Sequence, residues 1–163
     1  LEAFKTSNVM MDVGEAAGMY LSETRESGAR ILQLETRLRI ADYIKEYLSG
    51  NAKYGEMIPG NLGLDDTRIE GQIAQYNTTK MNRDRLVADS SEDSPVVQGL
   101  DASLETMRNG IRLSIDNLIM SLEVQKRDAE RQEEQALAKF TKMPSTARKM
   151  LTLERQQKIK ETL

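Results

Sequence analysis

Hydrophobic residues recur in steps of three and four between Ser94 and Lys142, which is the pattern of a helix with one apolar side. Ser94 is a suitable N-cap, and Pro95 occupies the first helical position, where a missing amide hydrogen costs nothing. No further proline follows until Pro144. We therefore expect one very long helix over about 94–142, roughly 70 Å long. Its apolar series is Val97, Leu100, Leu104, Met107, Ile111, Ile115, Leu118 and Leu122.

The segment before this helix is predicted to hold a second long helix over about 12–49. Residues 1–8 carry a weak pattern, so we expect them to form an extended or frayed lead-in. Gly14, Gly18 and Gly28 each weaken the helix by up to about 1 kcal/mol, or else permit a close helix crossing. Residues 49–51, Ser-Gly-Asn, form a typical C-terminal signal.

Two shorter helices complete the expected set. Residues 51–63 contain Pro-Gly-Asn and indicate a loop, after which Asp65 or Asp66 caps a helix over 65–89. A polar hinge at 89–95 leads into the long helix, and a last helix is expected over 145–163. Short joins between helices favour antiparallel neighbours. The prediction is a single all-α domain over 1–163, an elongated antiparallel helical bundle or coiled-coil hairpin with one very long helix.

The helix over 65–89 is about half as long as the helix over 94–142, so it cannot cover it. We expect a helical core at one end and a bare two-helix hairpin, in need of partners, at the other. Substituting Leu118 or Leu122 with Asp is predicted to disturb assembly or polymer length if these residues face a seam.

Composition excludes several classes of site. The chain has 163 residues with no Cys and no His, which removes most zinc sites, Ser-His and Cys-His nucleophiles, and Glu-x-x-His di-iron sites. The net charge of -3 argues neither for a nucleic-acid partner nor for a strongly acidic surface, and no nucleic-acid partner is expected. No run reaches the roughly 18 apolar residues of a membrane helix, and no signal peptide is visible. Because the chain begins at Leu1 rather than Met, we expect it to be a fragment of a longer protein.

Charged residues offer few candidate sites. Gly50 and Gly55 have the spacing of a phosphate-binding loop, but Glu56 and Met57 replace the required Lys and Ser/Thr. The carboxylates are interpreted as a solvated face or as helix caps, and no catalytic, cofactor or metal site is predicted; they are Glu130, Glu133, Glu134, Asp65, Asp66, Glu92 and Asp93. The basic C-terminal side chains are interpreted as a solvated helix end, with a polyanion or lipid headgroups as the alternative; they are Lys139, Lys142, Arg148, Lys149, Arg155, Lys158 and Lys160.

Aromatic, sulfur-containing and arginine side chains at helical spacing have two interpretations. Packing is favoured over sugar stacking or phosphorylation for the five tyrosines, Tyr20, Tyr43, Tyr47, Tyr54 and Tyr76. Met107, Met120, Met143 and Met150 are interpreted as seam fillers, with an adaptable partner groove as the alternative. Arg108 and Arg112, four positions apart, are candidates to contact an anionic polymer or the carboxylate of a neighbouring copy.

Three stretches, taken in order, carry a resemblance to a known family. The first is Ile-Pro-Gly-Asn-Leu-Gly-Leu-Asp-Asp at 58–66, followed by Ile69, Ile73, Tyr76-Asn77 and Arg85-Leu86. The second is Asp-Ser-Pro-Val-Val at 93–97 with Leu100, Arg108 and Ile111. The third is Met143-Pro144 with Leu151, Leu153-Glu154-Arg155 and Lys158-Ile159. From about residue 29 onward, the chain resembles the periplasmic region of the polysaccharide co-polymerases, or chain-length determinant proteins, and within them that of the bacterial tyrosine kinases of capsule and exopolysaccharide export.

The resemblance implies a protein anchored in the inner membrane by two helices, with this region in the periplasm. It implies a homo-oligomeric ring that works with the polysaccharide polymerase and the outer-membrane exporter, the polysaccharide itself being a further candidate partner. Both membrane helices, the α/β portion near the membrane, the kinase domain and the family's Tyr-x-x-Leu-Leu segment are missing here. We therefore expect no enzymatic activity in this chain. The alternative from another class is a cytosolic coiled-coil adaptor that binds a partner helix.

Overall fold

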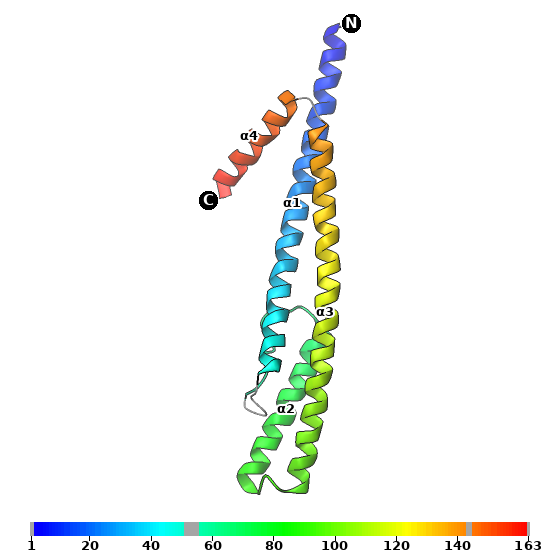
Figure 1. Cartoon of the computed structure of the whole chain (residues 1–163). Helices are drawn as coiled ribbons and strands as arrows, with labels where there is room; N and C mark the ends of the chain where they lie inside the picture. Colours follow the sequence, from blue (N-terminus) through cyan, green and yellow to red (C-terminus); the bar gives the residue numbers. More distant parts are fainter. Residues whose placement is uncertain (1, 51–55, 143–144, 163) are drawn as a thin grey trace. The chain divides into compact units, whose positions relative to one another are not determined.

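The computed structural model describes residues 2–50, 56–142 and 145–162, with side chains described over 14–50, 56–142 and 152–161. It contains four helices, α1 (Glu2–Ser49), α2 (Thr67–Asp89), α3 (Pro95–Thr141) and α4 (Ser145–Thr162) (Figure 1). No strand occurs within the described ranges. The predicted all-α class is confirmed.

Local capping chemistry explains where α2 and α3 begin. The Asp66 side chain accepts a hydrogen bond from the Ile69 amide at 3.0 Å, so Asp66 is the N-cap of α2. Asp65, the other candidate, instead has a positive φ of 60° in the turn before the helix. α3 begins at Pro95, and the Ser94 carbonyl accepts the first helical bond from the Gln98 amide at 3.0 Å.

The expected lead-in at 1–8 is wrong, because α1 is helical from Glu2 onward. The first proline of the chain is Pro59, so nothing in the N-terminal segment forbids continuous helical hydrogen bonding. Gly14, Gly18 and Gly28 lie inside the helix, and no described atom comes within 4 Å of a Cβ built on any of them. Among the described residues, these glycines therefore do not mark a close helix crossing. With 48 residues, α1 is as long as α3, which has 47.

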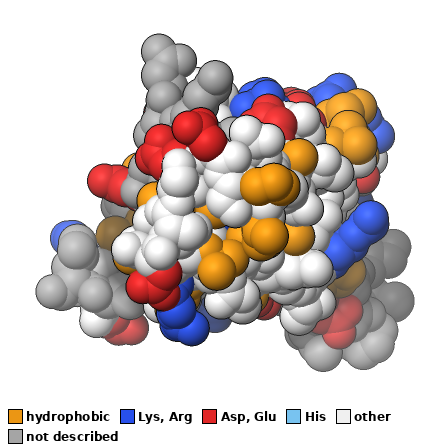
Figure 2. Space-filling model, turned by 90° about the horizontal axis from the view of Figure 1, so that it is seen from below, with side chains coloured by type: hydrophobic (Ala, Val, Ile, Leu, Met, Phe, Trp, Pro, Cys, Tyr) orange, Lys and Arg blue, Asp and Glu red, His pale blue; other side chains and the backbone are white. Residues whose placement is uncertain are grey.

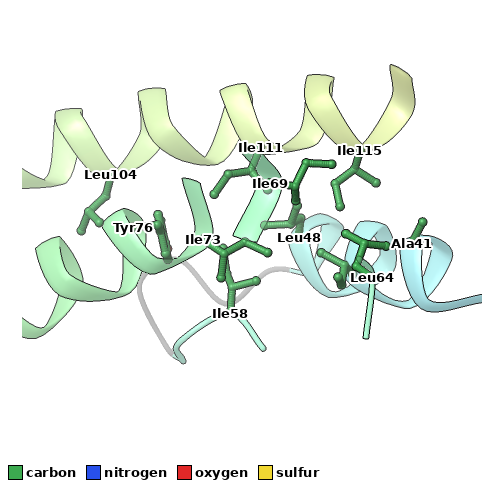
Figure 3. Close-up of a cluster of buried hydrophobic side chains, with 11 residues drawn as sticks. Ala41, Leu48, Ile58, Leu64, Ile69, Ile73, Tyr76, Leu104, Ile111 and Ile115 are labelled. Atoms are coloured by element: carbon green, nitrogen blue, oxygen red, sulfur yellow. The ribbon is translucent and has the colours of Figure 1, made fainter. Parts of the chain in front are cut away.

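The chain divides into two compact units, of which unit 2 comprises Leu34–Val124. Its core draws side chains from α1, α2, α3 and the α1–α2 loop, which point toward one another in Figure 3. Within this unit α1 and α3 run antiparallel, since Lys45 contacts Asp116 while the later Leu48 contacts the earlier Arg108. The buried cluster is Ala41, Ile44, Leu48, Ile58, Leu64, Ile69, Ile73, Tyr76, Leu104, Ile111 and Ile115.

Part of the α1–α2 loop belongs to this core. Ile58 and Leu64 are 3% and 2% exposed, so the loop covers the helices as a strap (residues 56–66) rather than extending into solvent. Gly63 has a φ of +84°, a conformation that favours glycine. Gly60 lies so close to Ile73 that a Cβ there would stand 3.3 Å from the Ile73 Cγ2. These two glycines fit the strap onto α2.

The turn between α2 and α3 forms one end of unit 2. Figure 2 views the molecule from this end, where hydrophobic side chains gather near the centre of the view and charged side chains lie mostly around them. Among the residues flanking the turn, Val96 is 62% exposed and Leu86 is 38% exposed. Some apolar surface therefore reaches solvent here.

Unit 1 comprises residues 1–33 and 125–163 and has a smaller described core. The rings of Tyr20 and Phe140 stack with centroids 4.5 Å apart and planes inclined by 17°. Ala136 is buried beside them, with Ala17 and Leu21 partly buried. Stacked aromatic rings contribute about 0.5–1.5 kcal/mol beyond their buried area. This contact joins α1 to α3 within the unit.

Candidate functional site

The guanidinium groups of Arg108 and Arg112 bind the C-terminus of α1. Arg108 donates from Nε and Nη2 to the Leu48 carbonyl oxygen at 3.1 and 2.7 Å, and from Nη2 to the Gly50 oxygen at 3.3 Å. Arg112 Nη2 donates to the same Leu48 oxygen at 3.1 Å. A helix C-terminus carries unsatisfied carbonyls and partial negative charge, so two guanidinium groups stabilise it. Within the chain, these side chains act as a cap; the anionic polymer and the neighbouring copy considered for them remain untested.

Hydrogen bonds fix the strap to the helices beneath it. The Asn77 side-chain amide accepts from the Ile58 amide at 2.8 Å and donates to the Ile58 carbonyl at 2.9 Å. Arg37 donates to the Leu64 and Asp65 carbonyls at 3.0 and 3.3 Å. One side chain on α2 and one on α1 thus satisfy loop backbone groups that would otherwise lack partners.

Tyr47 also contacts the strap, through its hydroxyl. The hydroxyl donates to the Met57 carbonyl at 2.9 Å and lies 3.2 Å from Glu56 Oε2. Burial raises the pKa of Tyr47, and the hydrogen bond with the Glu56 carboxylate raises it further. Glu56, which stands where a phosphate-binding loop needs lysine, therefore serves the loop's own structure. Gly55 lies outside the described residues.

The tyrosines and methionines divide between core and surface. Packing is found for Tyr20, Tyr47 and Tyr76, whereas Tyr43 is 54% exposed, so packing within the chain is wrong for Tyr43. Met107 packs against the unit 2 core, but Met120 is 64% exposed and is not a seam filler within the chain. Tyr54, Met143 and the side chain of Met150 lie outside the described parts.

The carboxylates singled out from the sequence do not converge. Glu130 lies 3.8 Å from Lys126. Glu134, Glu92 and Asp93 are exposed, and Glu133 is half-buried. No group of three or more Asp or Glu side chains able to hold a metal ion occurs among the described residues. The arrangement offers structural ion pairs rather than a paired acid and base.

A charged cluster that sequence reasoning missed joins α2 to α3. Arg83 Nε donates to Asp101 Oδ1 at 2.8 Å, and the buried Lys80 donates to Asp84 Oδ2 at 2.7 Å. Burial by itself would raise the pKa of Asp84, but hydrogen bonds from Lys80 and Arg83 outweigh it, so the pKa lies below the usual 3.8. Removing one member would leave a desolvated charge. The Arg83–Asp101 pair is the member of the cluster that links α2 to α3.

Basic side chains from α1 and α4 line a groove in unit 1. The groove has a volume of about 670 Å³ and is lined by Leu21, Thr24, Arg25, Arg155, Lys158, Ile159 and Glu161. Three cations and one carboxylate give it a positive balance, with two aliphatic side chains beside them. Two members of the basic C-terminal run therefore lie next to Arg25 of α1, while the side chains of Arg148 and Lys149 lie outside the described set. The groove is a candidate contact for an anionic polymer.

Comparisons of this chain with protein-family models, with curated proteins and with solved structures found no match. None of the described helices holds an apolar run long enough to span a membrane.

Proposed function

We propose that this chain is the structural and interaction module of a membrane-anchored polysaccharide co-polymerase. In this proposal the module stands in the periplasm, and it regulates the chain length and export of a surface polysaccharide. It performs no catalysis itself. The parent protein carries the inner-membrane helices, with or without a cytosolic tyrosine kinase domain.

The observation that carries the proposal is how the residues behind the resemblance are used. Ile58 of the first stretch is held by Asn77, which follows in the same stretch. Ile69, Ile73 and Tyr76 meet Ile111 of the second stretch in the core of unit 2. Arg108, also of the second stretch, caps α1. Residues scattered along the sequence thus depend on one another in space, which supports their reading as one family pattern rather than as separate coincidences.

The mechanism follows from long helices used as spacers. In this proposal the helices form an elongated antiparallel bundle, and copies stand side by side as a ring around the growing polymer. The size and flexing of the ring govern how long the polymerase holds the polymer before release to the outer-membrane exporter. For an acidic polysaccharide, the basic groove of unit 1 is the proposed contact with the polymer.

The test is genetic and biochemical. Deleting the gene, then restoring it with the Arg108→Ala/Arg112→Ala variant, should first abolish and then only partly recover the normal length distribution of the surface polysaccharide on gels. Because these arginines cap α1, a destabilised module should control length less well. An unchanged distribution after deletion would contradict the proposal.

A location experiment separates the proposal from the cytosolic adaptor. External protease should degrade this region in spheroplasts, in which the outer membrane is opened, but not in intact cells. Protection in spheroplasts together with degradation after lysis would instead support an adaptor that binds a partner helix.

A further inference from the structure

Both long helices of unit 2 expose large hydrophobic side chains outside their shared core. Leu113 and Met120 of α3 are each 64% exposed, Val124 is 52% exposed, and Tyr43 of α1 is 54% exposed. Each lies two positions from a buried core residue, namely Ile111, Leu122, Leu122 and Ala41 respectively. Two positions correspond to about 200° of helix rotation. The three α3 side chains therefore point away from the seam that α1 and α3 share, and Tyr43 lies on an exposed side of α1.

A stripe along the outward side of α3 is also free of charge, although 30% of the chain is charged. Seven exposed positions in steps of three and four form this outward stripe: Ala102, Thr106, Asn109, Leu113, Asn117, Met120 and Val124. Most charged side chains of α3 in this unit have partners within the chain. Asp101 pairs with Arg83 and Asp116 with Lys45, while Arg108 and Arg112 bind the end of α1. An uncharged stripe at this spacing is typical of a helix–helix contact.

Exposed residues of α1 lie at nearly the same height along the helix axis as part of this α3 stripe. Lys45 and Asp116 form an ion pair at 2.9 Å, which fixes one common level of the antiparallel helices. Tyr43 lies about 3 Å and Met120 about 6 Å from that level, in the same direction. Arg39 and Glu123 follow at about 9 and 10 Å on the same side. Two copies standing side by side at equal height would bring Tyr43 to Met120, and Arg39 to Glu123.

We propose that the outward stripe of α3 packs against the Tyr43 side of α1 in a second copy of this chain. The contact pairs exposed apolar side chains with each other and one basic side chain with one acidic side chain. Since the two contacting faces differ, each copy offers one face to each neighbour, and such a contact forms a ring when the rotation between copies closes on itself, as the proposed function requires. The common direction of the copies rests on the proposed function, in which all are anchored in one membrane.

The experiment is site-directed crosslinking of the full chain, which contains no natural cysteine. The Tyr43→Cys/Met120→Cys variant, treated with a short bis-maleimide, should give a ladder of dimers, trimers and larger species, because every chain carries both halves of the contact. Each single variant should stay monomeric. The matched control, Tyr43→Cys/Gln75→Cys, places the second thiol at an exposed position of α2 and should give no ladder.

A charge exchange tests the same contact without relying on thiol reactivity. Glu123→Arg in the double-cysteine background should lower ladder yield about twofold to fivefold, and adding Arg39→Glu should restore it. Dimers from Met120→Cys alone would show α3 meeting α3 and would overturn the proposal, as would equal yields in the control. If crosslinking gives the ladder but deleting the gene leaves polymer length unchanged, the contact is upheld and the proposed function is rejected. The absence of a ladder would reject the contact alone.

Discussion

Asn77 of α2 forms two hydrogen bonds with the backbone of Ile58, at 2.8 and 2.9 Å, in the manner of one strand pairing with another. Asn77→Ala should lower the free energy of unfolding by about 1–3 kcal/mol, because a half-buried amide and carbonyl lose their partners. Urea titration followed by circular dichroism measures this. Gln75→Ala, at an exposed position of the same helix, is the matched control and should change stability by less than about 0.5 kcal/mol. Equal effects would contradict the role assigned to Asn77.

The cap on α1 should depend on guanidinium geometry and not on charge alone. Arg108 contacts the Leu48 oxygen through two nitrogens, which the single ammonium of lysine cannot reproduce. Arg108→Ala is expected to cost about 1.5–3 kcal/mol, and Arg108→Lys to recover only part of that loss. Full recovery by lysine in urea titrations would show that charge is sufficient. Arg85→Ala, an exposed arginine of α2, provides the baseline.

Two glycines should respond to alanine in opposite directions. Gly63 has a φ of +84°, so Gly63→Ala should destabilise the protein by about 1–2 kcal/mol. Gly71 lies inside α2 with no described atom within 4 Å of the added Cβ, so Gly71→Ala should stabilise by up to about 1 kcal/mol. Thermal melts of the two variants beside the parent measure both shifts. A loss of stability in Gly71→Ala would contradict the open space described around it.

Alanine substitutions of Leu122 and Leu113 should affect stability differently, because Leu122 lies in the core and Leu113 in the outward stripe. Leu122 is fully buried, so Leu122→Ala should cost about 2–5 kcal/mol. Leu113 is 64% exposed, and Leu113→Ala should change stability by less than about 0.5 kcal/mol. Chemical denaturation monitored by circular dichroism makes the comparison. Because Leu122 is buried and Leu118 packs on the core, Asp at either position would unfold the chain and would not isolate a contact between copies.

Acid should weaken the α2–α3 cluster. The pKa of Asp84 is lowered in the folded chain, so its stabilising effect is present above the ordinary aspartate value of 3.8 and is lost as the pH falls through the lower folded value. The stability difference between the parent and Asp84→Asn should therefore shrink on acidification below 3.8. Denaturation at a series of pH values checks this. A difference that grows in acid would reverse the assigned sign.

Capping residues made several boundaries predictable from the sequence. Asp66 and Pro95 have side-chain chemistry that belongs at helix starts, and α2 and α3 begin beside them. The start of α1 is not predictable from apolar spacing, because the weak pattern at 1–8 indicates an extended or frayed lead-in, although no residue there prevents helical bonding.

The contacts of the candidate site were harder to predict, because they involve backbone atoms or whole sides of a helix. Arg108 and Arg112 contact the carbonyl oxygen of Leu48. Every residue has a backbone carbonyl, so the residue type does not indicate which carbonyl is contacted. Tyr43 and Met120 follow helical spacing, yet spacing does not say which side of a helix meets its own chain. The exposed outward stripe could have been found by asking which α3 positions lack charge on the side opposite the apolar series.

The cap on α1 also leads us to expect a particular order of events in folding. The Leu48 carbonyl receives its bonds from Arg108, 60 positions later, whereas Arg83 and Asp101 are only 18 positions apart. Contacts between distant residues carry a larger loop-closure cost and form later. We therefore expect that α1 first forms with its last turn incomplete, that α2 and α3 then pair, and that Arg108 completes the end of α1 last.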